Sequence, residues 1–280
     1  FTVAGRIGAQ GQELAPLDEA ALNAIADRIA AGAYGAVAIG FIHSYLNPAH
    51  EVRAREIIAA KLELPISISS EVSPQMREFE RFNTVCANAY VRPQMASYLD
   101  RLQTRLKEHG AHCPVFMIHS GGGLVSVETA AEFPVRLVES GPAGGAIFAA
   151  DVARRFGLGK VVSYDMGGTT AKICLIEDFA PKTARSVEVA RTTRFANGSG
   201  MPISIPVIEM IEIGAGGGSI AWVDAMGRIQ TGPESAASEP GPACYQRGGQ
   251  RPAITDADLI LGKLDPDNFA GGAIRLSTDM

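Results

Sequence analysis

The sequence contains few cysteines, and no two of them lie close together. The four cysteines are at positions 86, 113, 174 and 244, with no CxxC spacing. This distribution argues against a zinc knuckle and against a dense disulfide framework. Reduced thiols in a cytoplasmic protein are the simplest account of the cysteine content.

Basic clusters and long apolar runs are also absent from the sequence. Lysine and arginine total 25 against 30 acidic residues, a net charge of −5 with no basic block, so the electrostatic footprint of a nucleic-acid-binding protein is missing. No apolar run reaches the roughly 18 residues of a membrane-spanning helix. There is no internal repeat and no low-complexity segment. We therefore expect a cytoplasmic protein without nucleic-acid or membrane partners.

The composition that remains is typical of a globular protein. Hydrophobic residues make up 46% of the 280 positions and charged residues 20%, which allows a sizeable core and two domains. The chain opens on Phe1 with no methionine and no signal-peptide pattern, and it stops at Met280 without a closing element. We expect it to be a fragment of a longer protein.

Apolar periodicity predicts alternating helices and strands, an α/β fold. Helices are expected over residues 17–31, 48–62, 84–109 (interrupted or bent near Pro93) and 141–156, and strands over 36–42, 66–69 and 115–118. Strands and glycine loops follow, to about residue 229. The first β-α-β order predicts a parallel strand pair with a right-handed crossover. A boundary near residues 110 to 120 divides the chain into domains at 1–115 and 116–280.

The segment Ser163–Lys172 is the most informative, because Asp165 precedes Gly167-Gly168-Thr169-Thr170 between two apolar runs. This pattern predicts a strand, a tight turn and a second strand. The glycines allow positive φ and close approach of a ligand, successive N–H groups form an anion site, and threonine hydroxyls can donate to phosphate. Asp165 suits Mg²⁺ or its water shell. The segment predicts a hairpin that holds a phosphate and its metal, with a turn that merely requires glycine as the alternative.

Three further glycine clusters occur in the sequence. The cluster His119–Gly123 follows a predicted strand, at the strand end where open α/β sheets bind ligands. The cluster Ser140–Gly145 opens a helix whose bare N–H groups suit an anion, although close helix packing explains Gly144 and Gly145 equally well. The cluster Gly214–Ser219 can lie flat against a nucleotide or form a structural loop, and we expect it to lie near the Asp165 turn. Because glycine is entropically costly, so many clusters are hard to explain by turns alone.

Other polar side chains have two interpretations each. His43, His50 and His119 are candidate acid-base groups, and we expect two of the three to be structural. His119 is the most interesting because it adjoins a glycine loop. Glu78 and Glu80 with Arg81 form either a solvated charged face or part of a cleft or interface.

Together these segments resemble the hydantoinase A/5-oxoprolinase family, whose ATP-dependent subunit is also called N-methylhydantoinase A. The resemblance runs over nearly the whole chain in the family's order. The stretches that carry it are Ser44–Glu51, Glu71–Pro74, Glu78–Thr84, Glu139–Gly145, Asp165–Thr170, Gly214–Ser219, Glu239–Tyr245 and Thr255–Leu259.

The resemblance implies an actin-like, ribonuclease H-like ATPase architecture of two lobes, with ATP in the cleft and the first lobe incomplete here. The family carries two phosphate motifs of the Asp-x-Gly-Gly-Thr type, and Asp165–Thr170 would be the second. Nothing in residues 1–35 resembles the first. Many family members have Thr-Asp where this sequence reads Ala171-Lys172. At position 172, a lysine thus replaces the aspartate of many family members, which puts a metal role for this position in doubt. Lys172 either pairs with phosphate or faces solvent.

The resemblance also implies that the protein uses ATP and Mg²⁺, and it implies the type of reaction. Phosphorylating the oxygen of a cyclic amide, of the hydantoin or 5-oxoproline type, makes its carbon reactive to water, and a B-type subunit supplies much of the hydrolysis. Asp165 and His119 are the expected catalytic residues, and Asp165 and Asp256 the expected metal ligands; Asp256 is otherwise an N-cap for a helix over 258–262. The expected nucleotide-binding residues are Gly141, Gly144, Gly145, Gly167, Gly168, Thr169, Thr170, Gly214, Gly216, Gly217, Gly218 and Ser219.

Two other functions are compatible with the same motifs. One is an ATP-dependent ketone carboxylase subunit, and the other is a non-catalytic, nucleotide-gated actin-like module. Because only one phosphate turn is present, we expect the 280-residue chain to be inert by itself. We also expect it to self-associate as a homo-oligomer through apolar surface left uncovered around residues 36–42.

Overall fold

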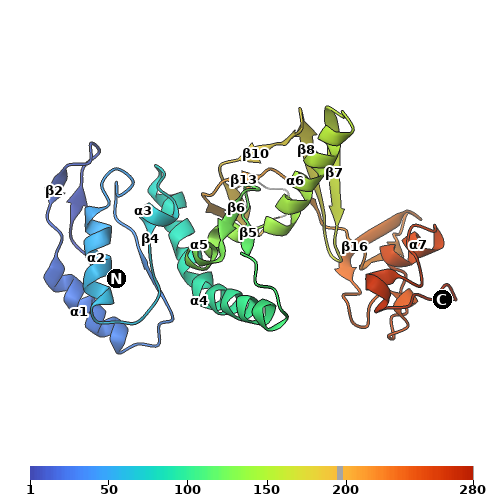
Figure 1. The fold of residues 1–280 in the computed structure, drawn as a ribbon, viewed down its shortest axis with the longest axis horizontal. Helices are drawn as coiled ribbons and strands as arrows, with labels where there is room; N and C mark the ends of the chain where they lie inside the picture. The colour runs from blue at the N-terminus through green and yellow to red at the C-terminus, as the bar shows by residue number, and fades with distance from the viewer. Residues whose placement is uncertain (194–197, 280) are drawn as a thin grey trace. The chain divides into compact units, whose positions relative to one another are not determined.

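A computed structural model of the chain describes residues 1–193 and 198–279. The chain forms two compact units (Figure 1). The first comprises Phe1–Gly144 with Thr183–Ile208, and the second comprises Gly145–Lys182 with Glu209–Met280. The expected domain boundary between residues 115 and 116 stays a prediction, because these units are defined by packing alone.

The first unit opens with the predicted β-α-β arrangement. Its elements are β1 (Arg6–Ile7), β2 (Glu13–Ala15), α1 (Glu19–Ala30), β3 (Val37–Ile39), α2 (Ala49–Ala59) and β4 (Ile66–Ile68). Asp18 caps α1 by accepting from the Ala21 N–H at 2.9 Å. Strands β3 and β4 pair in parallel, as expected. Helices α2 and α4 pack against this strand pair, and α1 packs on α2 (Figure 1). The apolar faces of α1 and α2 share one core with the two strands.

The rest of the first unit is built around one long helix. Its elements are α3 (Ser69–Val72), α4 (Glu78–Glu108), β5 (Phe116–Ile118), β6 (Leu124–Ser126), α5 (Val127–Glu132), η1 (Pro134–Leu137), β10 (Thr183–Ala184), β11 (Val187–Val189), β12 (Met201–Ile203) and β13 (Val207–Ile208). Helix α4 begins at Glu78, earlier than expected, and continues through Pro93 without interruption. The segment 183–208 packs onto this helix through a second core that includes Val85 and Ile203.

Arg81 belongs to a buried polar network and not to a solvated charged face. Arg81 and Glu51 are both fully buried. Arg81 donates to the Ser69 hydroxyl at 2.9 Å and to the Phe41 carbonyl at 2.8 Å. Glu51 accepts from the hydroxyls of Ser44 and Ser69 at 2.7 and 2.6 Å. The network therefore joins α2, α4 and the segments that follow β3 and β4.

The second unit is built around a β-hairpin and glycine loops. Its elements are the larger part of α6 (Ser140–Arg155), β7 (Lys160–Met166), β8 (Ala171–Glu177), β9 (Ala180–Pro181), β14 (Ile211–Ile213), β15 (Ser219–Val223), β16 (Ile229–Ser235), η2 (Ala243–Tyr245), α7 (Ile254–Ile260) and η3 (Phe269–Gly272). One sheet has the order β14-β8-β7, with β9 on β8, and β15 pairs with β16. Within the described ranges, no helix has the length and apolar character needed to cross a membrane.

Candidate functional site

The hairpin of β7 and β8 carries the Asp165–Thr170 segment. The strands pair antiparallel from Lys160↔Glu177 to Met166↔Ala171. The residues between them form the turn, which is closed by a hydrogen bond from the Gly167 N–H to the Thr170 carbonyl at 2.9 Å. The turn is exposed from Gly167 to Thr169. The strand, turn and strand expected from the sequence are confirmed.

The Gly214–Ser219 loop lies directly behind this turn. The Gly217 N–H donates to the Gly167 carbonyl at 2.9 Å, and the Gly218 N–H donates to the Gly168 carbonyl at 2.7 Å. Gly216 is required by this approach, since a Cβ there would lie 2.6 Å from the Gly167 oxygen and from the Thr169 nitrogen. The expected adjacency of the two glycine loops is confirmed, and the second loop supports the first.

These two hydrogen bonds set the direction of the turn's own N–H groups. In a trans peptide, the C=O and the N–H that follows it point in opposite directions. Because the carbonyls of Gly167 and Gly168 point toward the supporting loop, the N–H groups of Gly168 and Thr169 point away from it. Two successive N–H groups on the exposed side of a turn form a concavity suited to an anion.

The packing of the described chain does not require a glycine at position 168. Neither Gly167 nor Gly168 has a positive φ, so the conformational reason expected for these glycines is wrong. A Cβ at Gly168 would meet no atom of the described chain within 4 Å. The bare backbone is therefore available to a ligand that approaches from outside.

Asp165 is an exposed carboxylate beside the turn. The strand register places it opposite Lys172, which in turn lies opposite Glu212. The Lys172 Nζ is 3.9 Å from the Glu212 Oε1. Protein-bound Mg²⁺ usually keeps several waters and takes one or two carboxylates plus phosphate oxygens. A single exposed carboxylate next to a turn with two outward N–H groups fits that kind of site.

Asp256 is instead buried, with 4% of its surface exposed. Its carboxylate accepts from the N–H groups of Ala253 at 2.7 Å, Cys244 at 2.8 Å and Ala243 at 3.3 Å. Helix α7 begins at Ile254, earlier than the 258 expected, so Asp256 stabilises its first turn from within rather than as N-cap. A metal role for Asp256 stays a prediction that these three bonds do not favour.

Two hydroxyls hold the supporting loop in place. The buried Ser219 hydroxyl accepts from the Gly216 N–H at 2.9 Å, which is a structural use of a residue expected to bind nucleotide. The N–H and hydroxyl of Thr255 both donate to the Gly217 carbonyl at 2.8 Å. We did not single out Thr255 from the sequence, although it opens the Thr255–Leu259 stretch of the family resemblance. The position of Thr255 shortly before a predicted helix start is the sequence feature that could have identified it.

His119 and its glycine loop belong to the first unit. The His119 ring accepts from the Gly121 N–H at 3.0 Å. Side chains at Gly121 and Gly123 would lie 2.9 and 2.5 Å from atoms of this ring, so the ring itself requires both glycines. The acid-base role of His119 stays a prediction.

The remaining sequence candidates have structural contacts. The His50 ring lies 2.7 Å from the Glu13 carboxylate, and the His43 ring lies 2.9 Å from the Ile7 carbonyl. In α6, a Cβ at Gly144 would lie 3.0 Å from Ile118, so close helix packing explains this glycine. A Cβ at Gly141 or at Gly145 would meet no atom of the described chain within 4 Å.

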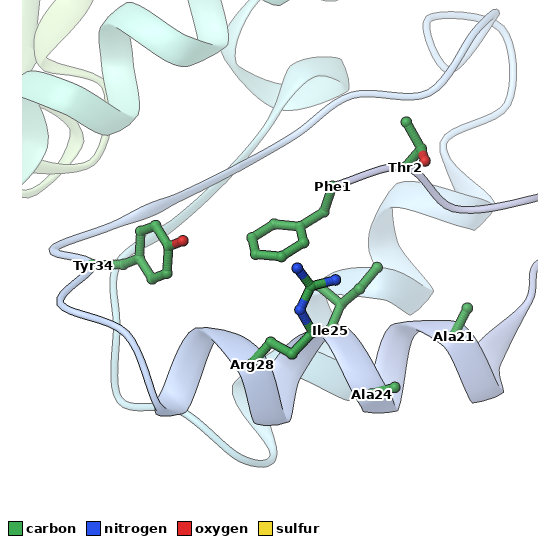
Figure 2. Close-up of a pocket in the computed structure, with 7 residues that line it drawn as sticks. All are labelled: Phe1, Thr2, Ala21, Ala24, Ile25, Arg28 and Tyr34. Atoms are coloured by element: carbon green, nitrogen blue, oxygen red, sulfur yellow. The ribbon is translucent and has the colours of Figure 1, made fainter.

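One cavity lies elsewhere, at the start of the first unit, with a volume of about 640 Å³. Its lining residues are Phe1, Thr2, Ala21, Ala24, Ile25, Arg28 and Tyr34 (Figure 2). The Arg28 guanidinium lies 4.7 Å from the centre of the Phe1 ring. This lining contains no histidine, carboxylate or thiol beside its Thr2 and Tyr34 hydroxyls, so we do not regard it as the reactive site. A second cavity, of about 350 Å³, borders residues 37–42, where uncovered apolar surface was expected.

Comparisons with known proteins show that the chain is similar to parts of longer proteins. It is 39% identical over 276 residues to the caprolactamase subunit alpha of Pseudomonas jessenii, covering 98% of this chain and 38% of that protein. It is 34% identical over 256 residues to the 5-oxoprolinase of Saccharomyces cerevisiae, covering 90% of this chain and 19% of that protein. The chain thus spans about two fifths, or less, of the length of these relatives.

Two solved structures share the α/β fold of this chain. The crystal structure of the ATP-dependent caprolactamase from Pseudomonas jessenii matches with a TM-score of 0.74 at 39% identity, over 98% of this chain and 39% of that one. A nucleotide-free acetone carboxylase structure matches with a TM-score of 0.74 at 28% identity, over 98% of this chain and 38% of that one. The sequence matches the hydantoinase/oxoprolinase N-terminal region over residues 1–62 and the hydantoinase/oxoprolinase family over residues 81–280. Since the second match alone covers most of the chain, the chain belongs to the hydantoinase/oxoprolinase family.

Proposed function

We propose that this chain is the nucleotide-binding part of an ATP-dependent enzyme that opens a cyclic amide. The observation that carries the proposal is the Gly167–Thr170 turn, whose carbonyls are held from behind while the N–H groups of Gly168 and Thr169 face outward. Such a turn binds phosphate oxygens. The similarity to a caprolactamase and to a 5-oxoprolinase supports the amide as the substrate class.

The proposed architecture is actin-like, with ATP held between two lobes. The turn of the second unit would be one of two opposed phosphate turns. Asp165 would organise Mg²⁺, which screens the phosphate charge when bound, and the hydroxyls of Thr169 and Thr170 would donate to phosphate oxygens. Gly141 and Gly145, where the chain leaves space open, would border the nucleotide at the start of α6.

The reaction we propose begins with transfer of the γ-phosphoryl group of ATP to the amide oxygen. The O–P bond forms as ADP leaves, and the ring carbon becomes open to attack by water. Phosphoryl transfer depends mainly on positioning and on stabilisation of charge, which suits a site made of backbone N–H groups with few reactive side chains. A B-type subunit would carry out much of the hydrolysis, as the names of several relatives as alpha, beta or gamma subunits suggest.

The test uses the full-length protein together with its B-type subunit. We expect lactams, hydantoins or 5-oxoproline to be opened only when ATP is present, with one phosphate released per ring opened. Ring opening without ATP, or phosphate release that no cyclic amide stimulates, would contradict the proposal.

A second candidate is an ATP-dependent ketone carboxylase. It is favoured by 34% identity to the acetophenone carboxylase gamma subunit of Aromatoleum aromaticum, over 97% of this chain and 37% of that protein. The same preparation, given a ketone and bicarbonate, separates the two. Phosphate release stimulated by the ketone and not by the amides would select the carboxylase.

A further inference from the structure

The two N–H groups that the Gly167–Thr170 turn presents are each the end of a row of hydrogen-bonded peptide groups. Because the C=O and the following N–H of a trans peptide point in opposite directions, a peptide that accepts on one side donates on the other. In the first row, the Gly218 N–H donates to the Gly168 carbonyl at 2.7 Å, and the N–H of that second peptide points outward. The carbonyl in the peptide of the Gly218 N–H is that of Gly217, and it accepts from Thr255. The first row therefore begins at Thr255.

A second row follows the same pattern and begins at a backbone group. The Ser219 N–H donates to the Gly216 carbonyl at 2.9 Å. The N–H of the same peptide, that of Gly217, donates to the Gly167 carbonyl at 2.9 Å, and the Gly168 N–H points outward. Both rows thus run in the same sense, and both have their donor ends on the exposed side of the turn.

Thr255 begins the first row with two donors. Its N–H and its hydroxyl both donate to the Gly217 carbonyl at 2.8 Å, and the residue is 7% exposed. The N–H belongs to the first turn of α7, where backbone N–H groups have no partner within the helix. A Cβ at Gly217 would lie 2.8 Å from the Thr255 Oγ1, so the glycine leaves room for this hydroxyl. The hydroxyl is a side-chain group, and a substitution can remove it while the backbone donor stays.

Hydrogen bonds that follow one another in a row strengthen each other. A donor that binds a carbonyl polarises the peptide group, which makes the N–H on its other side a stronger donor. Gly216, Gly218 and Ser219 are buried, and hydrogen bonds are electrostatically stronger in the low dielectric of a buried segment. A change at the start of a row is therefore transmitted to the N–H at its exposed end.

We infer that Thr255 is a positioning residue, which acts through two successive peptide groups to hold the Thr169 N–H toward a bound phosphate. The inference rests on the proposed function, in which the ligand of the turn is a phosphate group of ATP. The Thr255 hydroxyl fixes and polarises the Gly217 carbonyl and does not itself contact the phosphate. Donors that are oriented before the charge arrives stabilise it without a cost of reorganisation.

Two substitutions at Thr255 separate hydrogen bonding from packing. Thr255→Val nearly keeps the volume of the side chain and removes the hydroxyl, whereas Thr255→Ser keeps the hydroxyl and removes the methyl group. In calorimetric titrations of the full-length protein with ATP and Mg²⁺, we expect Thr255→Val to bind about threefold to tenfold more weakly, the range for one hydrogen bond. Thr255→Ser should bind as the unaltered protein does. The matched control is Thr231→Val, at an exposed threonine of β16, which should leave the affinity unchanged.

The order of the two variants decides between the roles. If Thr255 only fills space, Thr255→Ser binds ATP more weakly than Thr255→Val, and this order would overturn the inference. Equal affinity of Thr255→Val and the unaltered protein would overturn it as well. Thermal unfolding of each variant establishes that folded protein is titrated. Failure of the unaltered protein to bind ATP would instead contradict the proposed function, so the two failures are distinguishable.

Discussion

Gly216 is the residue on which the geometry of the Gly167–Thr170 turn depends most. A Cβ there would overlap the backbone of Gly167–Thr169, which cannot move without losing its bonds to Gly217 and Gly218. We expect Gly216→Ala to lower the free energy of unfolding of the second unit by about 1–3 kcal/mol, the usual cost of overpacking. Urea unfolding measures this change.

The control for this substitution is Gly145→Ala in α6. A Cβ at Gly145 would meet no atom of the described chain within 4 Å. Replacing an interior helical glycine with alanine should stabilise the protein by about 0.5–1 kcal/mol. If Gly216→Ala behaves like Gly145→Ala, the turn and its supporting loop are not packed as described.

Cys244 tests the packing beneath the same loop. Burial, together with the hydrogen bond and charge of Asp256, raises the pKa of its thiol to about 12. The unfolded thiol ionises at about pH 8.5, so the unfolded state gains stability as the pH rises above that value. The contribution of Cys244 to the free energy of unfolding is therefore complete below about pH 8.5 and is lost progressively toward pH 12.

Thiol labelling of the native protein at pH 8 provides the measurement. Cys86 and Cys113 are exposed and should react in the native protein, Cys86 more slowly because desolvation raises the pKa of its thiol, whereas the buried Cys174 and Cys244 should react only after the protein opens. Reaction of all four thiols at one rate would contradict this account. In the Cys244→Ala variant, the free energy of unfolding should fall less than in the wild type as the pH rises from 9 to 12.

At the scale of elements, the Glu51–Arg81 network joins the helices and strands of the first unit. Arg81 is fully buried and donates to Ser69, Gln75 and Phe41. Its removal leaves buried acceptors without a partner, so we expect Arg81→Ala to cost about 3 kcal/mol. Thermal unfolding should show a large drop for Arg81→Ala and almost none for Arg53→Ala, a surface arginine paired with Glu19. Similar drops for both variants would contradict the network's structural role.

Elements with clear periodicity could be predicted from the sequence, and those that depend on distant contacts could not. The helix over 19–30 and the parallel pair β3–β4 follow from local apolar spacing. The start of α4 at Glu78 was not predicted, and neither was the burial of Arg81, because its acceptors on Phe41 and Ser69 come from distant segments of the sequence. No local pattern indicates that the segment 183–208 packs back onto α4, since that contact joins residues more than a hundred positions apart.

The same division holds within the candidate site. The hairpin around Asp165 and the adjacent glycine loop are local patterns and were predicted correctly. The backbone hydrogen bonds of Asp256 and Ser219 could not be predicted, because a buried carboxylate or hydroxyl bonded to backbone N–H groups has the same sequence signature as a ligand-binding one. The metal role of Asp256 and the nucleotide role of Ser219 stay predictions.

At the scale of the whole molecule, each unit has its own buried core. The first contains the cluster around Leu22 and Ile39, and the second contains the cluster of Cys244, Leu259 and Leu276. We expect the Arg81→Ala change to speed hydrogen exchange chiefly in the first unit and the Gly216→Ala change chiefly in the second, because local openings follow local packing. Equal acceleration throughout both units for either variant would show that the units do not open separately.

The central claim is that ATP binds against the bare backbone of Gly168, and one pair of variants tests it most directly. Neither Gly168 nor Gly159 has a positive φ, and a Cβ at either would meet no atom of the described chain within 4 Å, so alanine should be tolerated at both. Calorimetric titration of the full-length protein with ATP and Mg²⁺ should show at least about tenfold weaker binding for Gly168→Ala, or about 1.4 kcal/mol, and unchanged binding for Gly159→Ala. Equal affinity of the two variants for ATP would contradict the claim that this turn holds the nucleotide.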